Sequence, residues 1–109
     1  MFARMVFFKL EPGSRRLAEQ VVQELNLISR QQKGFRGNAY FFEDGKGEYA
    51  ALNYWESKKD AESANAIMFP YFQAAVRDVV KEEPALRIFE VYDPLEKLPL
   101  DTTASLYDY

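Results

Sequence analysis

Apolar residues alternate with a period of two in four stretches of the chain, a pattern typical of β-strands. The clearest stretch covers residues 48–55, where one parity holds Tyr49, Ala51, Asn53 and Trp55 and the other holds Ala50, Leu52 and Tyr54. The same alternation predicts strands over residues 2–10, 35–43 and 85–92. The first three strands carry large apolar side chains on both parities, so both faces of their sheet are expected to be apolar.

Between these strands, two segments show the apolar spacing of amphipathic helices. Over residues 15–32 the apolar side chains fall on one stripe. Ser14 is the expected N-cap and Gly34 the expected C′ residue of this helix. A second helix is predicted from Ser57, with Asp60 three residues later, as at a capped helix start. Pro70 is expected to break or kink this helix, followed by a further helical piece through Val80.

The order of these elements predicts a ferredoxin-like α+β fold, β-α-β-β-α-β, with an antiparallel sheet. Residues 43–47 form the expected hairpin connection. Both helices of such a fold cover the same sheet face, which leaves the other apolar face without cover. We expect a second copy to cover it, giving an obligate homodimer built as an eight-stranded barrel. Residues 1–94 are the expected domain, and residues 95–109 a tail that docks on the dimer partner.

Composition restricts the possible partners and location. The chain has 109 residues, 48% hydrophobic and 28% charged, which fits one globular domain. Its net charge is −3 without a basic stripe, so nucleic acid is not an expected partner. No apolar run approaches the length of a membrane span, and the first residues lack a signal-peptide layout. These features predict a cytoplasmic protein that acts without a membrane.

The chain contains no Cys and no His. Disulfides, Cys or His metal sites, thiolate nucleophiles and His general bases are therefore excluded, as is a haem held by a proximal His. The acidic residues form no close pair that would suggest general acid–base work. We expect neither a metal site nor a cofactor.

Asn53 and Trp55 are the first candidates for chemistry, because they share a face of one strand. A buried amide needs partners, and in a pocket Asn53 could orient a phenol or stabilise an oxyanion. Equally, a neighbouring strand or helix could satisfy Asn53, and Trp55 could fill the junction between strand and helix as core.

Tyrosines and arginines offer a second set of polar groups. The hydroxyls of Tyr40, Tyr49, Tyr54 and Tyr71 could donate to a bound quinol or to superoxide, although for each tyrosine alone packing in the core or at an interface is the favoured role. Arg4 and Arg36 interrupt apolar strands and could contact an acidic substrate. For both arginines the simpler expectation is a salt bridge at the surface or at the dimer interface.

Four motifs carry a likeness to a known family. They are Glu11-Pro-Gly-Ser14, Gly34-Phe35, Tyr54-Trp55-Glu56-Ser57 and Phe89-Glu-Val-Tyr-Asp-Pro94. With them, residues 1–94 resemble the antibiotic biosynthesis monooxygenase (ABM) domain family of the dimeric α+β barrel superfamily. The resemblance implies one pocket per subunit, between the sheet and its helices and lined by Trp55.

We assign two groups of residues to this expected pocket. The candidate catalytic residues are Asn53, Trp55 and Tyr71. The candidate substrate-binding residues are Tyr40, Phe42, Tyr49, Asn65, Met68 and Phe72.

The family resemblance implies a cofactor-independent monooxygenase acting on a small aromatic, polyphenolic or quinol substrate. The alternative is a non-catalytic dimeric module of the same fold that binds a ligand or regulates. Haem-degrading members combine an Asn on the first strand, this Trp and a His about ten residues later. Here Val6, Phe7 and Phe8 lie where that Asn would be, and Asn65 lies near the His position, so haem degradation is disfavoured.

Overall fold

A computed structural model describes residues 1–97 and has the predicted order of elements. Four strands, two long helices and two short helical turns make up these described residues. In chain order they are β1 (Phe2–Lys9), α1 (Arg15–Arg30), β2 (Phe35–Glu43), η1 (Asp44–Lys46), β3 (Glu48–Trp55), α2 (Lys58–Val76), β4 (Ala85–Glu90) and α3 (Pro94–Lys97). The ferredoxin-like β-α-β-β-α-β prediction is confirmed.

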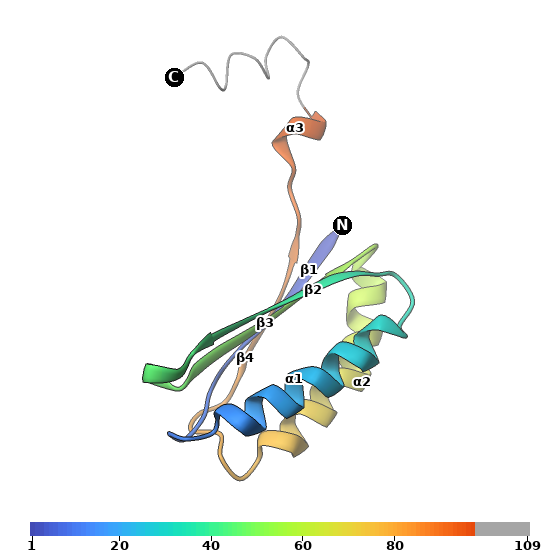
Figure 1. The fold of residues 1–109 in the computed structure, drawn as a ribbon. Helices are drawn as coiled ribbons and strands as arrows, with labels where there is room; N and C mark the ends of the chain where they lie inside the picture. Colours follow the sequence, from blue (N-terminus) through green and yellow to red (C-terminus); the bar gives the residue numbers. More distant parts are fainter. Residues whose placement is uncertain (98–109) are drawn as a thin grey trace, which may run out of the picture.

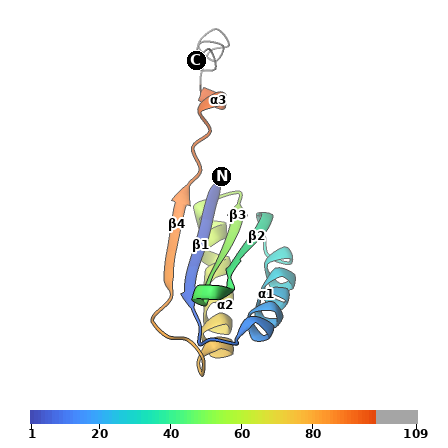
Figure 2. The same ribbon diagram turned by 60° about the vertical axis from the view of Figure 1, so that its left-hand side comes forward.

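The four strands form one antiparallel sheet in the order β2-β3-β1-β4. Both long helices lie against the same face of this sheet, as Figures 1 and 2 show. The strand register pairs Arg4 with Asn53, and Asn53 with Asn38. Since directly opposed residues point to the same face, three polar side chains stand in a row across the middle of the sheet, beneath the helices.

The helix-covered face holds the core. Its buried apolar side chains come from β1, β3, α1 and α2, and Trp55, Phe72, Leu10 and Met68 are among the largest that are fully buried. Aromatic contacts connect the layers, with the Phe8 ring edge-on to Phe72 at 4.7 Å and stacked with Tyr49 at 5.5 Å between centroids. The aromatic residues of this face therefore hold the helices against the sheet.

The opposite sheet face has no cover in the part of the chain that the structure describes. Phe7 on β1, Phe41 on β2 and Phe89 on β4 are 45%, 52% and 38% exposed. They stand among Ala50, Leu52 and Tyr54 of β3, so the open face is apolar, as the two-sided strand pattern predicted.

Of the two predicted N-caps, one is confirmed and the other is not. The Ser57 side chain caps α2 by accepting a hydrogen bond from the backbone N–H of Asp60 at 3.1 Å, as expected. Ser14 precedes α1 but makes no capping hydrogen bond with its side chain. Gly34 has a left-handed φ of 83°, yet α1 already ends at a C-cap on Gln31, so Gly34 serves the following turn and is not the C′ residue.

The prediction for Pro70 was wrong in part. The α2 helix runs without a break from Lys58 to Val76, with Pro70 inside it. Proline deletes one backbone hydrogen bond, but the buried side chains of Met68 and Phe72 on either side keep the helix packed on the sheet. Val80 is not helical, because it forms an isolated bridge with Leu10 of the first strand region.

The β4 strand ends at Glu90, two residues earlier than predicted, and is followed by the short α3 turn. The separation of a domain from a tail at residue 95 stays a prediction. The proposed docking of that tail concerns residues 98–109, which lie outside the described residues.

Candidate functional site

The polar row beneath the helices centres on Arg4, which is 2% exposed. The guanidinium donates from Nη1 to Oδ1 of Asn53 at 2.7 Å and from Nε to Oδ1 of Asn65 at 2.8 Å. Asn53 is fully buried on β3, and Asn65 lies on α2. One arginine therefore connects the sheet to the helix above it through two neutral amide oxygens.

The row continues from Asn53 towards α1. The Asn53 amide donates to Oδ1 of Asn38, and the Asn38 amide donates to Oδ1 of Asn26 and to Oγ of Ser29, each at 2.8 Å. The Ser29 hydroxyl in turn donates to the backbone carbonyl of Asn26 at 2.9 Å. A continuous hydrogen-bond chain thus crosses the covered face, a pattern that fixes the orientation of every amide in it.

A small cavity adjoins this chain, between the sheet and both long helices. Its volume is about 10 Å³, room for no more than one water molecule. Polar atoms of Arg4, Tyr40 and Asn53 meet apolar side chains there. The lining residues are Arg4, Val6, Phe8, Val22, Leu25, Tyr40, Ala51, Asn53, Met68 and Phe72.

Burial perturbs both titratable groups that line the cavity. Removal from water lowers the pKa of Arg4 to about 10, an effect that the neighbouring Tyr40 only partly offsets. Burial raises the pKa of the Tyr40 hydroxyl to about 12, against the opposing effects of the Arg4 and Arg30 charges and of the neighbouring Ser29 hydroxyl. The Tyr40 hydroxyl oxygen is buried and has no hydrogen-bond partner. At neutral pH the cavity is therefore lined by a guanidinium cation and a neutral phenol.

The structure brings together five of the nine assigned site residues. Asn53, Tyr40, Met68 and Phe72 line the cavity, and Asn65 binds Arg4. Their roles in catalysis or binding remain predictions.

The other four assigned residues lie elsewhere. Trp55 is fully buried, its ring edge-on to Phe35 at 5.8 Å, and its indole Nε1 has no hydrogen-bond partner. Phe42 and Tyr49 pack edge to face at 4.9 Å and do not line the cavity themselves, although Tyr49 stacks on Phe8, which does. Tyr71 lies on α2, is 38% exposed and does not line the cavity.

The two arginines differ from each other. The expectation of a salt bridge is correct for Arg36, which is exposed and donates to Glu56. It is wrong for Arg4, which is buried beneath the helices and forms no salt bridge with any carboxylate of residues 1–95. Its shared parity with Val6 and Phe8 was the signal in the sequence, because that parity faces the core. Asn38, Asn26 and Ser29 had no such signal.

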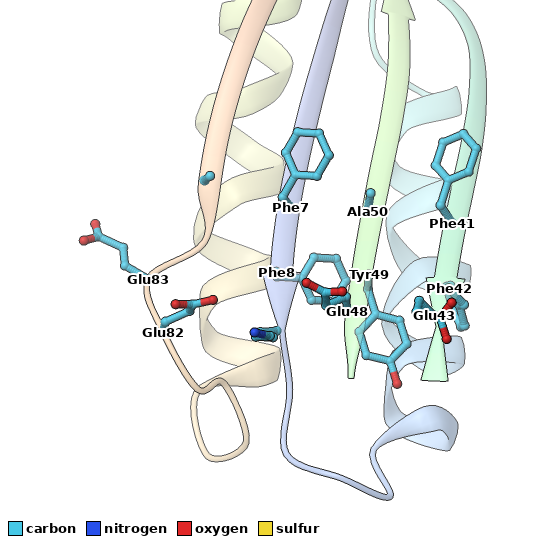
Figure 3. Close-up of a pocket in the computed structure, with 12 residues that line it drawn as sticks. Phe7, Phe8, Phe41, Phe42, Glu43, Glu48, Tyr49, Ala50, Glu82 and Glu83 are labelled. Carbon is cyan, nitrogen blue, oxygen red and sulfur yellow. The ribbon is translucent and has the colours of Figure 1, made fainter. Parts of the chain in front are cut away.

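A second, larger hollow of about 580 Å³ lies on the open sheet face. Figure 3 shows Phe7 and Phe41 flanking Ala50 on the neighbouring strands, with Glu43, Glu48 and Glu82 grouped towards one end. Within residues 1–97 no group of acidic side chains is arranged to hold a metal ion. The described helices also include none that is long and apolar enough to cross a membrane.

The fold and the buried polar row define a ferredoxin-like α+β protein with a candidate site between its sheet and helices. The sequence model of one family, antibiotic biosynthesis monooxygenase, matches residues 1–78. The chain therefore belongs to the antibiotic biosynthesis monooxygenase family.

Solved structures share this fold at low sequence identity. Rv0793 from Mycobacterium tuberculosis is 15% identical with a TM-score of 0.71, over 84% of this chain and 95% of that one. SnoaB, a cofactor-independent oxygenase from Streptomyces nogalater, is 17% identical with a TM-score of 0.69, over 84% and 93%. NE2512 from Nitrosomonas europaea, a protein of unknown function, is 10% identical with a TM-score of 0.73, over 84% and 89%. No curated protein matches the sequence significantly.

Proposed function

We propose that this protein is a cofactor-independent monooxygenase that oxidises a small aromatic, polyphenolic or quinol substrate between its sheet and helices. The observation that carries this proposal is the buried chain from Asn65 through Arg4 to Asn53, beside the unpartnered hydroxyl of Tyr40. Buried polar groups destabilise a fold unless they are satisfied, so such a cluster in an apolar core is a candidate for function. Family membership supports the same reaction class.

The proposed chemistry needs only the substrate and O₂. An ionised phenol donates electrons to O₂; one oxygen atom enters the ring, which becomes a quinone, and the other leaves as water. The substrate supplies all the electrons, so no external reductant is required. The protein would hold the ring away from water and stabilise developing negative charge with the N–H groups of Arg4 and the amide of Asn53.

We further propose that the protein acts as a homodimer joined through the open sheet faces. The exposed Phe7, Phe41 and Phe89 support this, because an apolar patch of this kind is unusual on the surface of a monomer. The hollow of 580 Å³ on this face would then lie within the interface.

The closed packing of the site favours a second candidate function. Trp55 is fully buried and the cavity has a volume of only about 10 Å³, so an aromatic ring enters only if Met68 and Phe72 move. A non-catalytic module of the same fold fits this packing, because it needs no room for a substrate ring between the sheet and the helices. In both candidates haem degradation stays disfavoured, because the sequence has no His.

Oxygen consumption distinguishes the two candidates. Purified protein is incubated with a panel of polyphenols and quinols in an oxygen electrode. The oxygenase predicts protein-dependent uptake that Asn53→Ala lowers by about 100-fold, the scale of losing one oxyanion donor. Ile67→Ala, on the exposed side of α2, is the matched control and should keep the wild-type rate. Ligand binding without any uptake would favour the non-catalytic module.

A further inference from the structure

Arg4 is a buried cation without a counter-anion in the described part of the chain. Both of its hydrogen bonds go to neutral amide oxygens. In each ion pair of the described side chains, the cation is an arginine other than Arg4. A guanidinium carries five N–H donors in a fixed fork, which matches the geometry of an anionic oxygen. Removing such a charge from water is costly unless an anion compensates it.

The surroundings of Arg4 reinforce its positive potential. Tyr40, on β2, lines the same cavity, and its hydroxyl is buried without a hydrogen-bond partner. Arg30, at the end of α1, is close enough to affect the titration of Tyr40. The remaining elements packed over Arg4 contribute Asn53, Asn65 and apolar side chains, and none of the residues that line the cavity is acidic. The cavity therefore brings the Arg4 guanidinium and the Tyr40 hydroxyl together without an acidic side chain between them.

We propose that Arg4 is the residue that selects an anionic ligand: the site binds its aromatic substrate as a monoanion, with the charged oxygen between the Arg4 guanidinium and the Tyr40 hydroxyl. This inference rests on the proposed function for the choice of an aromatic substrate. The anionic oxygen can come from a phenolate or from an aromatic carboxylate. Asn53 and Asn65 position the guanidinium for it.

The dimensions of the site indicate how such a ligand fits. The cavity beside Arg4 accepts a group the size of one oxygen atom. The ring has to replace the side chains of Met68 and Phe72, both of which line the cavity from α2. Pro70 lies between them and lacks the N–H that would hold this turn of the helix, and Met is flexible. The roof of the site is therefore the part of α2 with the weakest backbone support.

Binding of a chromogenic phenol tests the proposal without any turnover. 4-Nitrophenol is titrated into the wild-type protein near its own pKa, and the yellow phenolate band is followed. We expect the bound probe to be ionised, with its pKa lowered by about one unit or more, a preference of about tenfold for the anion. 4-Nitroanisole, a neutral analogue, should bind with an affinity at least about tenfold lower than that of 4-nitrophenolate. Competition by benzoate would identify carboxylates as ligands too; its absence would limit the class to phenolates.

Variants of Arg4 separate recognition from a structural role. Arg4→Gln should abolish the ionisation of the bound probe while the melting temperature stays the same or rises, because a buried charge is removed. Arg4→Lys keeps the charge and should retain part of the ionisation of the bound probe. This variant tests the proposal if Arg4→Gln fails to fold. Arg16→Gln, an exposed arginine on α1, is the matched control and should behave as wild type.

Three outcomes would overturn the inference. They are equal affinity of the wild type for 4-nitrophenol and 4-nitroanisole, no binding of either, and full ionisation of the probe bound to Arg4→Gln. The proposed function fails separately: phenolate binding without oxygen uptake refutes the oxygenase and keeps the anion site. Uptake at the same rate in wild type and Arg4→Gln keeps the oxygenase and refutes the anion site.

Discussion

The two faces of the sheet each carry side chains opposite in polarity to what their environment favours. The face beneath the helices is the natural place for an apolar core, yet it holds a buried arginine and a chain of amides. The open face is the natural place for polar residues, yet it presents Phe7, Phe41 and Phe89. Each exception indicates a missing partner. An anionic ligand would satisfy the first face, and a second copy of the chain would cover the other.

Breaking the open face should have the largest effect. The double variant Phe7→Asp/Phe41→Asp places charge where the proposed dimer buries two aromatic rings per protomer. Because buried aromatic anchors dominate interfaces, we expect a loss of about 3 kcal/mol or more, at least about 100-fold in the dimer Kd.

Sedimentation equilibrium measures this change. Leu27→Asp is the matched control, since Leu27 is 57% exposed on α1, on the helix side of the molecule. It should leave the dimer intact. A monomeric wild type would contradict the proposed assembly outright.

The second largest effect is expected when a carboxylate is placed beside Arg4 on the covered face. Asn65→Asp keeps the shape of the side chain and gives Arg4 a carboxylate oxygen where the amide oxygen now accepts at 2.8 Å. A hydrogen bond to a charged group contributes about 1.5–3 kcal/mol, so we expect a gain of about that size in the free energy of unfolding. The same change should abolish the binding of 4-nitrophenolate.

Urea unfolding and the nitrophenol titration measure the two effects of Asn65→Asp. Ser63→Asp, at an exposed position of the same helix, is the control for added negative charge and should change neither quantity. If Asn65→Asp destabilises the protein, Arg4 is already compensated and the account of the covered face is wrong.

The pH dependence of stability tests whether Arg4 and Tyr40 are buried beside each other. The folded pKa of Arg4, about 10, lies below its ordinary value, so the unfolded chain binds more protons above pH 10 and stability rises with pH. The folded pKa of Tyr40, about 12, lies above its ordinary 10.0, so the unfolded chain loses its proton first and stability falls with pH. In wild type the two effects oppose each other.

Tyr40→Phe removes the second effect and leaves the first. The stability of this variant relative to wild type should therefore rise as the pH increases through about 10 towards 12. Urea unfolding at a series of pH values measures the difference, in which the titration of all other groups cancels. A difference that is flat across this range would show that Tyr40 is not buried beside Arg4.

The smallest effect is expected at Arg36, the exposed counterpart of Arg4. Its partner Glu56 is also exposed, with side-chain exposures of 57% and 58%. Surface ion pairs contribute less than about 1 kcal/mol, so Glu56→Gln should lower stability by no more than that, and salt should erase the difference. A loss comparable to the change expected at Asn65 would mean that burial is not what distinguishes the two arginines.

The sequence predicted the layers of this fold well because period-two and helical patterns report which side of an element is apolar. It predicted the Ser57 cap correctly, since a capping motif is local. It failed at Pro70, where packing of Met68 and Phe72 from the rest of the fold outweighs the lost backbone hydrogen bond.

The candidate site was harder to predict than the fold. The sequence did not decide which parity of the strands the helices cover, and which polar groups meet depends on strand register. Arg4 was missed because an arginine among apolar residues is usually at the surface; its parity on the first strand was a signal, but its pairing with Asn53 required the strand register. Asn38 and Asn26 required the packing of α1 on β2.

A crystal structure with 4-nitrophenol bound tests the central claim most directly, because it shows which face takes the ligand. We predict a dimer joined through the open faces, with the ring between the sheet and α2 and the phenolate oxygen within hydrogen-bond distance of Arg4 and Tyr40. Met68 and Phe72 should be displaced. A probe lying instead between Phe7 and Phe41 on the open face, with the Arg4 cluster unchanged, would contradict the account.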